Sequence, residues 1–251
     1  MENQHVSEDK NTGTQQFENE QDVQVEASEK NLSGFSAWYE HYKKQVLGIS
    51  GLIVALAMGL YYYNMIYMPE QEAEAANAMY WAEDFFAKDS FKIALNGGIT
   101  VLTPDGPKTM SGFLQIADAY SATKPGNLAY YYAGVCLMRL GKFQDAISNF
   151  ERYSNDDVIV KSMAEGSIGD AYVELGKSNE GIDHYLKASK ISNTFTSPLF
   201  LKKAATIYEV LGDYANALLI LDRIQTEFHN STEASDVAKA IARVKAKQIQ
   251  K

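Results

Sequence analysis

The sequence predicts an all-α protein, a solenoid of stacked helical hairpins attached to a single N-terminal transmembrane helix. Two observations support this fold class. The first is an uncharged apolar run over residues 46–68, and the second is a pattern of glycines and small residues that recurs after residue 130. Much of the remaining chain beyond residue 69 is rich in Ala, Glu, Lys and Leu, which favour helix.

The apolar run Val46–Met68 has 23 residues and contains no Lys, Arg, Asp, Glu or His. A helix of this length spans roughly 34 Å, enough to cross a hydrocarbon core of about 30 Å. A cleaved signal peptide is the alternative, since Ala55-Leu56-Ala57 resembles a cleavage site. The apolar region of such a peptide is about 7–15 residues long. The longer run here predicts an uncleaved anchor in contact with membrane lipid.

The flanks of the run predict its orientation. Lys43 and Lys44 precede it, whereas Glu70, Glu72 and Glu74 follow it. Basic residues beside a membrane helix tend to stay in the cytoplasm. We therefore expect a single-pass membrane protein with its N-terminus in the cytoplasm and residues 69–251 on the outer side of the membrane.

Two segments precede the anchor. Residues 1–34 are polar and acidic and hold too few large apolar side chains to offset the entropy of ordering, which predicts a disordered cytoplasmic tail. Residues 35–45 combine aromatic and basic side chains and predict a short helix at the membrane interface.

Small residues recur within the anchor at Gly51, Ala55 and Gly59. This spacing of four residues forms a flat seam against which another membrane helix can pack closely. The alternative is that Gly is simply common in membrane helices. The seam is a hypothesis for a transmembrane partner.

The repeat is centred on Gly141, Gly176 and Gly212, each preceded by Leu and separated by 35 and 36 residues. These separations are close to the period of about 34 residues in tetratricopeptide repeats, which are helix–turn–helix units. Each glycine is expected at the turn that ends a first helix. Residues at constant offsets are small before the turn and large after it: Gly134, Gly169 and Ala205, then Phe150, Tyr185 and Leu221. The pattern predicts three tetratricopeptide hairpins.

Stacked hairpins of this kind line a concave surface that commonly holds a segment of another protein. The repeat alignment places nine side chains in this groove: Tyr131, Val135, Met138, Met163, Asp170, Val173, Lys202, Thr206 and Glu209. Their mixed character suits sequence-tolerant contact with non-native chains. The consecutive residues Tyr130, Tyr131 and Tyr132 cannot all face the groove, so some of them belong to the core.

The domain boundaries follow from these assignments. Residues 69–111 predict a membrane-proximal helix and a loop over 96–111 with room for a short strand, and residues 112–251 predict the repeat domain. The segment 112–121 is expected to pack as an incomplete leading unit. A last helix over about 231–250 is expected to cap the stack, with Val237, Ile241 and Val244 facing inward.

The sequence shows no catalytic constellation. The four histidines and Cys136 lack metal-ligand spacing, and no glycine-rich phosphate loop, HExxH or GxSxG motif occurs. We therefore expect no enzyme, no cofactor, no metal and no small-molecule substrate. The net charge of −9 and the lack of a concentrated basic face argue against nucleic acid. Cys136 lies in an apolar helix and is expected to be a buried, inert thiol.

The anchor followed by an exported tetratricopeptide domain resembles the YfgM-like ancillary subunits of the bacterial SecYEG translocon. The segments GNLAYYYAGVCLMRLGKFQDAI and GSIGDAYVELGKSNEGIDHYLKA are similar to members from Bacteroidota. The likeness covers residues 35–251 and implies a helper beside the translocon in the bacterial inner membrane. Its C-terminal domain would then be periplasmic and would work with periplasmic chaperones as proteins emerge. The long acidic tail departs from the short cytoplasmic segment of that family.

Two other interpretations stay open. A cell-envelope scaffold for wall synthesis or outer-membrane assembly would have the same architecture. An organellar import receptor would have its repeats in the cytosol, contrary to the orientation that Lys43 and Lys44 indicate.

Overall fold

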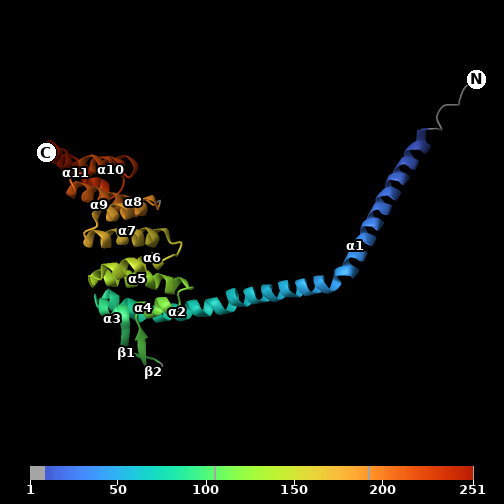
Figure 1. The fold of residues 1–251 in the computed structure, drawn as a ribbon, viewed down its shortest axis with the longest axis horizontal. Coiled ribbons are helices and arrows are strands. Elements are labelled where there is room, and N and C mark those ends of the chain that lie inside the picture. Colours follow the sequence, from blue (N-terminus) through green and yellow to red (C-terminus); the bar gives the residue numbers. More distant parts are fainter. Residues whose placement is uncertain (1–8, 105, 192, 251) are drawn as a thin grey trace, which may run out of the picture. The chain divides into compact units, whose positions relative to one another are not determined.

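The computed structural model describes residues 9–104, 106–191 and 193–250, with side chains from residue 36 onward. The chain forms two compact units, residues 1–66 and 67–251, which are described separately. The described part is mostly helical, as predicted, and it contains one two-stranded sheet (Figure 1).

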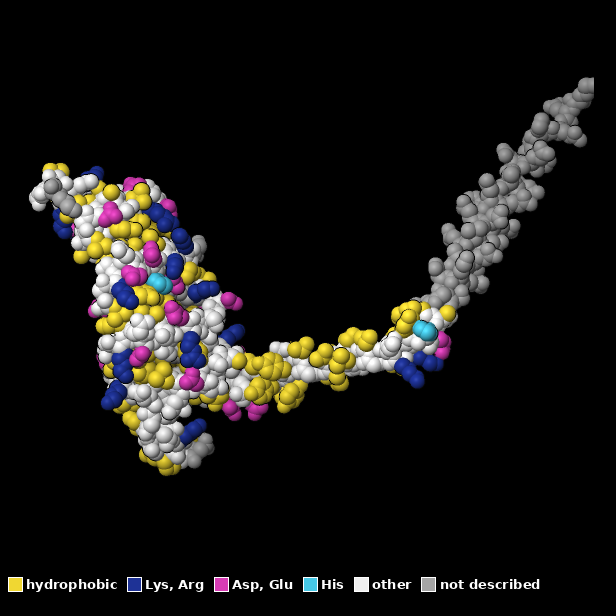
Figure 2. Space-filling model, viewed as in Figure 1, with side chains coloured by type: hydrophobic (Ala, Val, Ile, Leu, Met, Phe, Trp, Pro, Cys, Tyr) yellow, Lys and Arg dark blue, Asp and Glu magenta, His cyan; other side chains and the backbone are white. Residues whose placement is uncertain are grey.

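The first unit consists largely of one helix, α1 (Asp9–Tyr62). Among the described residues, one helical segment within residues 36–87 is long and apolar enough to cross a membrane. Its most apolar stretch is not buried by the rest of the protein. Figure 2 shows apolar side chains along this segment, with charged side chains gathered at its two ends. Large apolar side chains exposed all round a helix are typical of a membrane span.

The N-terminal tail is where the structure differs from the sequence-based expectation. The sequence predicts disorder over residues 1–34, whereas α1 begins at Asp9 and continues through the predicted interfacial helix 35–45. The tail is rich in Gln, Glu and Lys, which favour helix, so local propensity allows the helix to extend outward from the apolar run. Residues 1–8 lie outside the described residues.

The helix changes its hydrogen-bonding pattern just before Pro69. A π turn, η1 (Tyr63–Tyr67), separates α1 from α2 (Met68–Ala87), which has the proline in its first turn. Proline has no N–H, and its ring clashes with the carbonyl four residues earlier, which is that of Met65. A π turn lengthens the hydrogen-bonded loop at this point, and we attribute it to this conflict.

The second unit contains the three predicted hairpins and the predicted cap. Each helix packs against the next in sequence. The helices are α5 (Lys124–Arg139), α6 (Phe143–Arg152), α7 (Val158–Glu174), α8 (Ser178–Lys190), α9 (Thr196–Val210), α10 (Tyr214–Glu227) and α11 (Val237–Ile249), with a short 3₁₀ turn η2 (Glu233–Asp236) before the last. Val237 and Val244 of α11 are buried and Ile241 is half-buried, which caps the stack.

The three repeat glycines have the left-handed backbone that the sequence predicts. The φ angles are +71° at Gly141, +75° at Gly176 and +74° at Gly212. At the first turn, the N–H of Gly141 donates to the carbonyl of Met138 (3.1 Å), and that of Lys142 donates to Leu137 (2.9 Å). The same pair of bonds recurs at the other two turns. These bonds satisfy carbonyls at the end of each first helix, as in a Schellman motif.

Replacing Gly141 with alanine should lower the free energy of unfolding by about 1 kcal/mol, because a Cβ is unfavourable at positive φ. Urea unfolding followed by circular dichroism measures the effect. Lys142→Ala is the matched control, since this neighbouring side chain is exposed and its φ is negative. Equal midpoints for the two variants would contradict the prediction.

The small residues of the repeat lie under large side chains of the second helices. A Cβ at Gly134 would come within 2.6 Å of the Phe150 ring, and one at Gly169 within 2.8 Å of the Tyr185 ring. Ala205 belongs to the same buried cluster as Leu221. Because the first helix offers almost no side chain here, the two helices of each hairpin can approach closely.

The region before the first hairpin is more structured than predicted. It comprises α2, α3 (Phe91–Asn96), an antiparallel hairpin of β1 (Gly97–Thr103) and β2 (Gly106–Ser111), and α4 (Phe113–Ala119). The hairpin replaces most of the predicted loop 96–111. Alternate residues of β1 are half-buried against the core, which gives this short pair the support that an isolated hairpin lacks.

Helix α2 belongs to the repeat domain. It packs against α3, α4 and α5, and its residues Met79 and Ala82 share one buried cluster with residues of α5, α6 and α7. The predicted leading unit is present as α4, whose Phe113 stacks on Tyr132 of α5 (5.0 Å between ring centroids). The first helix of that unit is α2, which follows the apolar span directly in sequence.

Candidate functional site

The structure brings the nine predicted groove residues together in three adjoining hollows along α5, α7 and α9. The largest hollow has a volume of about 670 Å³ and lies between α5 and α7. Six of the nine residues line it: Tyr131, Val135, Met138, Met163, Asp170 and Val173. Phe143, Phe150 and Tyr185 from the second helices line it as well. Intervals of three, four and seven residues place these side chains on one face of each first helix.

The three consecutive tyrosines point in different directions. Tyr130 is buried and hydrogen-bonds to Arg152 of α6, whereas Tyr132 stacks on Phe113. Tyr131 alone among them lines the hollow. Its ring lies 6.1 Å from that of Tyr153 at the end of α6. The expectation that some of the three tyrosines belong to the core is confirmed by the buried Tyr130.

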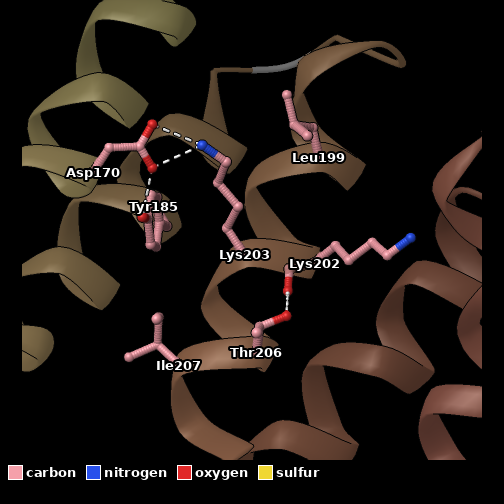
Figure 3. A pocket seen from close by; sticks show the side chains of 7 residues that line it. All are labelled: Asp170, Tyr185, Leu199, Lys202, Lys203, Thr206 and Ile207. Carbon is pink, nitrogen blue, oxygen red and sulfur yellow. Dashed lines mark hydrogen bonds and ion pairs between the residues drawn. The ribbon is translucent and has the colours of Figure 1, made fainter. Parts of the chain in front are cut away.

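The second hollow, of about 230 Å³, shares Asp170 with the first and extends to Lys202 and Thr206 of α9 (Figure 3). Both oxygens of Asp170 accept hydrogen bonds from Lys203 Nζ, each at 2.7 Å, and Oδ1 also accepts one from the Tyr185 hydroxyl at 2.6 Å. Burial and this hydrogen bond raise the pKa of Tyr185 well above its ordinary value. The negative charge of Asp170 is therefore balanced by the ammonium group of Lys203. Lys203, which holds it, was not among the predicted residues.

The third hollow, also about 230 Å³, lies between α9 and the cap and is lined by Lys202, Thr206 and Glu209. The side chain of Glu209 is only 7% exposed. It accepts hydrogen bonds from Arg243 Nε (2.9 Å) and Nη2 (2.8 Å), and from Lys247 Nζ (2.8 Å), both on α11. Glu209 therefore lines this hollow, but its carboxylate is engaged in ion pairs that hold the cap helix α11.

This ion-pair cluster gives a pH-dependent contribution to stability. The hydrogen bonds from Arg243, and after them those from Lys247, hold the pKa of Glu209 at about 2, against an ordinary 4.5, although burial works in the opposite direction. Because the folded-state pKa is the lower one, the ionised carboxylate stabilises the fold above about pH 4.5. That contribution is lost as the pH falls toward about 2.

We expect Glu209→Gln to lower the free energy of unfolding by about 2 kcal/mol near neutral pH, since it removes charge-assisted hydrogen bonds to a buried group. The difference from the natural protein should shrink as the pH falls below about 4.5. Urea midpoints measured across this pH range test it. Glu227→Gln is the control, because its exposed pair with Arg223 should contribute about 0.5 kcal/mol or less. A difference independent of pH would contradict the assignment.

Two other titratable side chains of the repeats, His184 and Cys136, pack against neighbouring residues of the fold. His184 Nδ1 lies 2.9 Å from Glu165 Oε1, and its ring stacks on Tyr172. Cys136 is fully buried, which raises its pKa to about 12 and keeps the thiol protonated. Within the part of the chain that the structure describes, no three His, Cys, Asp or Glu residues are grouped so that they could hold a metal ion.

A fourth hollow was missed by the sequence interpretation. It has a volume of about 370 Å³ and lies between α2, the start of α5 and the segment that joins α6 to α7. Its lining residues are Ala76, Met79, Glu83, Lys124, Pro125, Leu128, Tyr153, Asn155, Asp157 and Val160. The sequence gives no repeat signal for α2, so α2 was placed outside the repeat domain and its contribution could not be foreseen.

The predicted seam on the apolar span is open. A Cβ added at Gly51 or Gly59 meets no atom within 4 Å, and Ala55 between them is exposed. A partner helix at this seam stays a prediction.

The comparison with protein families agrees with the repeat architecture. The tetratricopeptide-repeat family profile matches residues 128–156, which cover most of the first hairpin. A crystal structure from Podosopora anserina, of nearly identical TPR-like repeats provisionally assigned to a kinesin light chain, is similar over 75% of this chain and 91% of that one, at 12% identity and a TM-score of 0.47. No curated protein sequence matches the chain. The second unit is thus a tetratricopeptide-like repeat domain that follows a long apolar N-terminal helix.

Proposed function

We propose that this chain is a non-enzymatic, membrane-anchored interaction protein that holds segments of other polypeptides in the groove of its first helices. The observation that supports this most is the continuity of the three hollows. The first two share Asp170, and the second and third share Lys202 and Thr206. A continuous groove can accommodate an extended chain, whereas a small molecule is usually enclosed in one pocket.

The lining of the groove favours tolerant recognition over a single fixed ligand. Met138 of α5 and Met163 of α7 both line the largest hollow, together with Tyr131 and Phe143. Methionine side chains are flexible and polarisable, and they adapt to partners of different shape. Exposed aromatic and methionine side chains are enriched where proteins bind one another. Emerging or non-native chains are ligands of this kind.

The anchor would confine this activity to a membrane surface. The exposed apolar segment of α1 supports a span, and the basic flank before it supports a cytoplasmic N-terminus and a periplasmic repeat domain. With the resemblance carried by the anchor and repeats, this leads us to propose an ancillary subunit of the Sec translocon of the bacterial inner membrane. In that role it would hand emerging proteins to periplasmic chaperones.

Co-purification of the full-length protein in mild detergent tests this role. We expect translocon subunits and periplasmic chaperones to be recovered, and Val135→Lys, which places a charge in the groove, to reduce recovery of the chaperones and exported clients. Leu219→Lys is the matched control, because Leu219 is 66% exposed on α10. Recovery of wall-synthesis or outer-membrane assembly proteins in place of translocon subunits would support the alternative of a cell-envelope scaffold.

A further inference from the structure

The hollow beside α2 continues the groove toward the helix that follows the apolar span in sequence. Leu128 lines this hollow, and Tyr131 and Val135 line the next, at intervals of three and four residues along α5. Val160 and Met163 repeat the arrangement on α7. Tyr131 of the largest hollow lies 6.1 Å, between ring centroids, from Tyr153 of this one, so the two hollows are neighbours. We name the hollow beside α2 the α2 pocket.

The walls of the α2 pocket are mainly apolar. Met79, Pro125, Leu128, Tyr153 and Val160 all contribute to them. Such walls suit the aliphatic stem of a long side chain that carries a charged head. The volume of about 370 Å³ is ample for one such side chain.

The pocket carries more negative than positive charge. Glu83 and Asp157 line it, whereas Lys124 is the one basic lining residue and is exposed. Asp157 accepts hydrogen bonds through Oδ1 from the N–H groups of Ile159 and Val160, which fixes its carboxylate at the start of α7. The two carboxylates create a negative potential that attracts cations.

Glu83 is the carboxylate best placed to receive a ligand. It is half-buried on α2, and no hydrogen bond or ion pair to it occurs among the described residues. Burial raises its pKa, so the charged form is disfavoured in the absence of a cation. An incoming cation would offset this cost, and the apolar walls would exclude water around the pair.

Resting on the proposed function, we propose that the α2 pocket takes a lysine or arginine side chain of the bound polypeptide, with its stem against Met79 and Leu128 and its charge at Glu83. The pocket would thereby select segments in which a basic residue lies among apolar ones. It would also fix which part of the segment lies against α2.

Fluorescence anisotropy with the full-length protein in detergent tests the proposal. The probes are the labelled peptide Ser-Gly-Val-Leu-Lys-Leu-Val-Gly-Ser and the same peptide with glutamine in place of lysine. We expect the lysine peptide to bind about tenfold more tightly, as is typical of a partly desolvated charge pair. Glu83→Gln should remove this preference, and Glu83→Lys should favour a third peptide with a central glutamate. Glu151→Gln changes an exposed carboxylate on α6 that lines none of the four hollows, and it should leave the preference intact.

The outcomes separate this inference from the proposed function. Equal binding of the lysine and glutamine peptides to the natural protein, or a preference that survives Glu83→Gln, overturns the basic-residue pocket and leaves polypeptide binding standing. If none of the peptides binds the natural protein, both proposals fail for these segments. Thermal unfolding of each variant verifies that the repeats are folded.

Discussion

Replacing Gly166 with alanine should destabilise the repeat stack by about 3 kcal/mol, the upper part of the range for overpacking a core. A Cβ at this position would lie 1.9 Å from Cε1 and 2.1 Å from Cζ of Phe200. The Phe200 ring is 1% exposed and stacks on Tyr185, so it has no free space to move into. The substitution therefore forces α7 and α9 apart.

Urea unfolding of the full-length protein, followed by circular dichroism, measures this effect. Lys161→Ala, an exposed substitution on the same helix, should change stability by about 0.5 kcal/mol or less. The double variant Gly166→Ala with Phe200→Leu should recover part of the loss, because the smaller side chain makes room for the new methyl group. A Gly166→Ala protein as stable as the Lys161→Ala control would contradict the packing described for α7 and α9.

Two arginines in the apolar span should release the protein from the membrane. Val54→Arg and Met58→Arg lie near the middle of residues 46–68, where each charge costs about 2.5–3.5 kcal/mol on an insertion scale. We expect the double variant to move from the membrane fraction to the soluble fraction after alkaline extraction. Gln45→Arg, at the edge of the run, is the control and should stay with the membrane.

The same fractions distinguish an anchor from a signal peptide. The intact mass of the membrane-bound protein should include residues 1–57, because the span is proposed to be uncleaved. A mature protein that begins near Met58, or a double-arginine variant that still resists extraction, would contradict the anchor.

The repeats could be predicted because their signals are local and recur. Gly141, Gly176 and Gly212 mark turns whose backbone favours glycine, and the small residues before each turn fix which face meets the second helix. Once these positions are aligned, the helical period determines which side chains share the groove. The nine residues proposed to line the groove were chosen in this way.

Contacts between residues far apart in the sequence could not be predicted. Glu209 pairs with Arg243 and Lys247, which lie 34 and 38 residues further on, and Lys203 reaches Asp170 across 33 residues. No spacing rule predicts these partners. The membership of α2 in the repeat domain was missed for a similar reason, since it shows in its contacts with α5 and has no repeat signal of its own.

Sequence signals for local structure also led to a wrong prediction where two of them compete. The polar composition of the tail predicts disorder, but its helix formers allow α1 to begin at Asp9. Around Pro104 and Gly106 the turn residues indicate a loop, whereas the β-branched residues of β1 pair with β2 to form a hairpin. Packing against α2 and α3 decides the second case, and such packing is not visible from sequence.

Site-specific photo-crosslinking in intact cells tests most directly whether the groove holds other polypeptides. A photoreactive amino acid placed at Val135 in the largest hollow should give crosslinks to exported or chaperone proteins, identified by mass spectrometry. The same amino acid at Leu219, exposed on α10, should give few. Equal crosslinking at the two positions, or crosslinks from Leu219 alone, would contradict polypeptide binding in the groove.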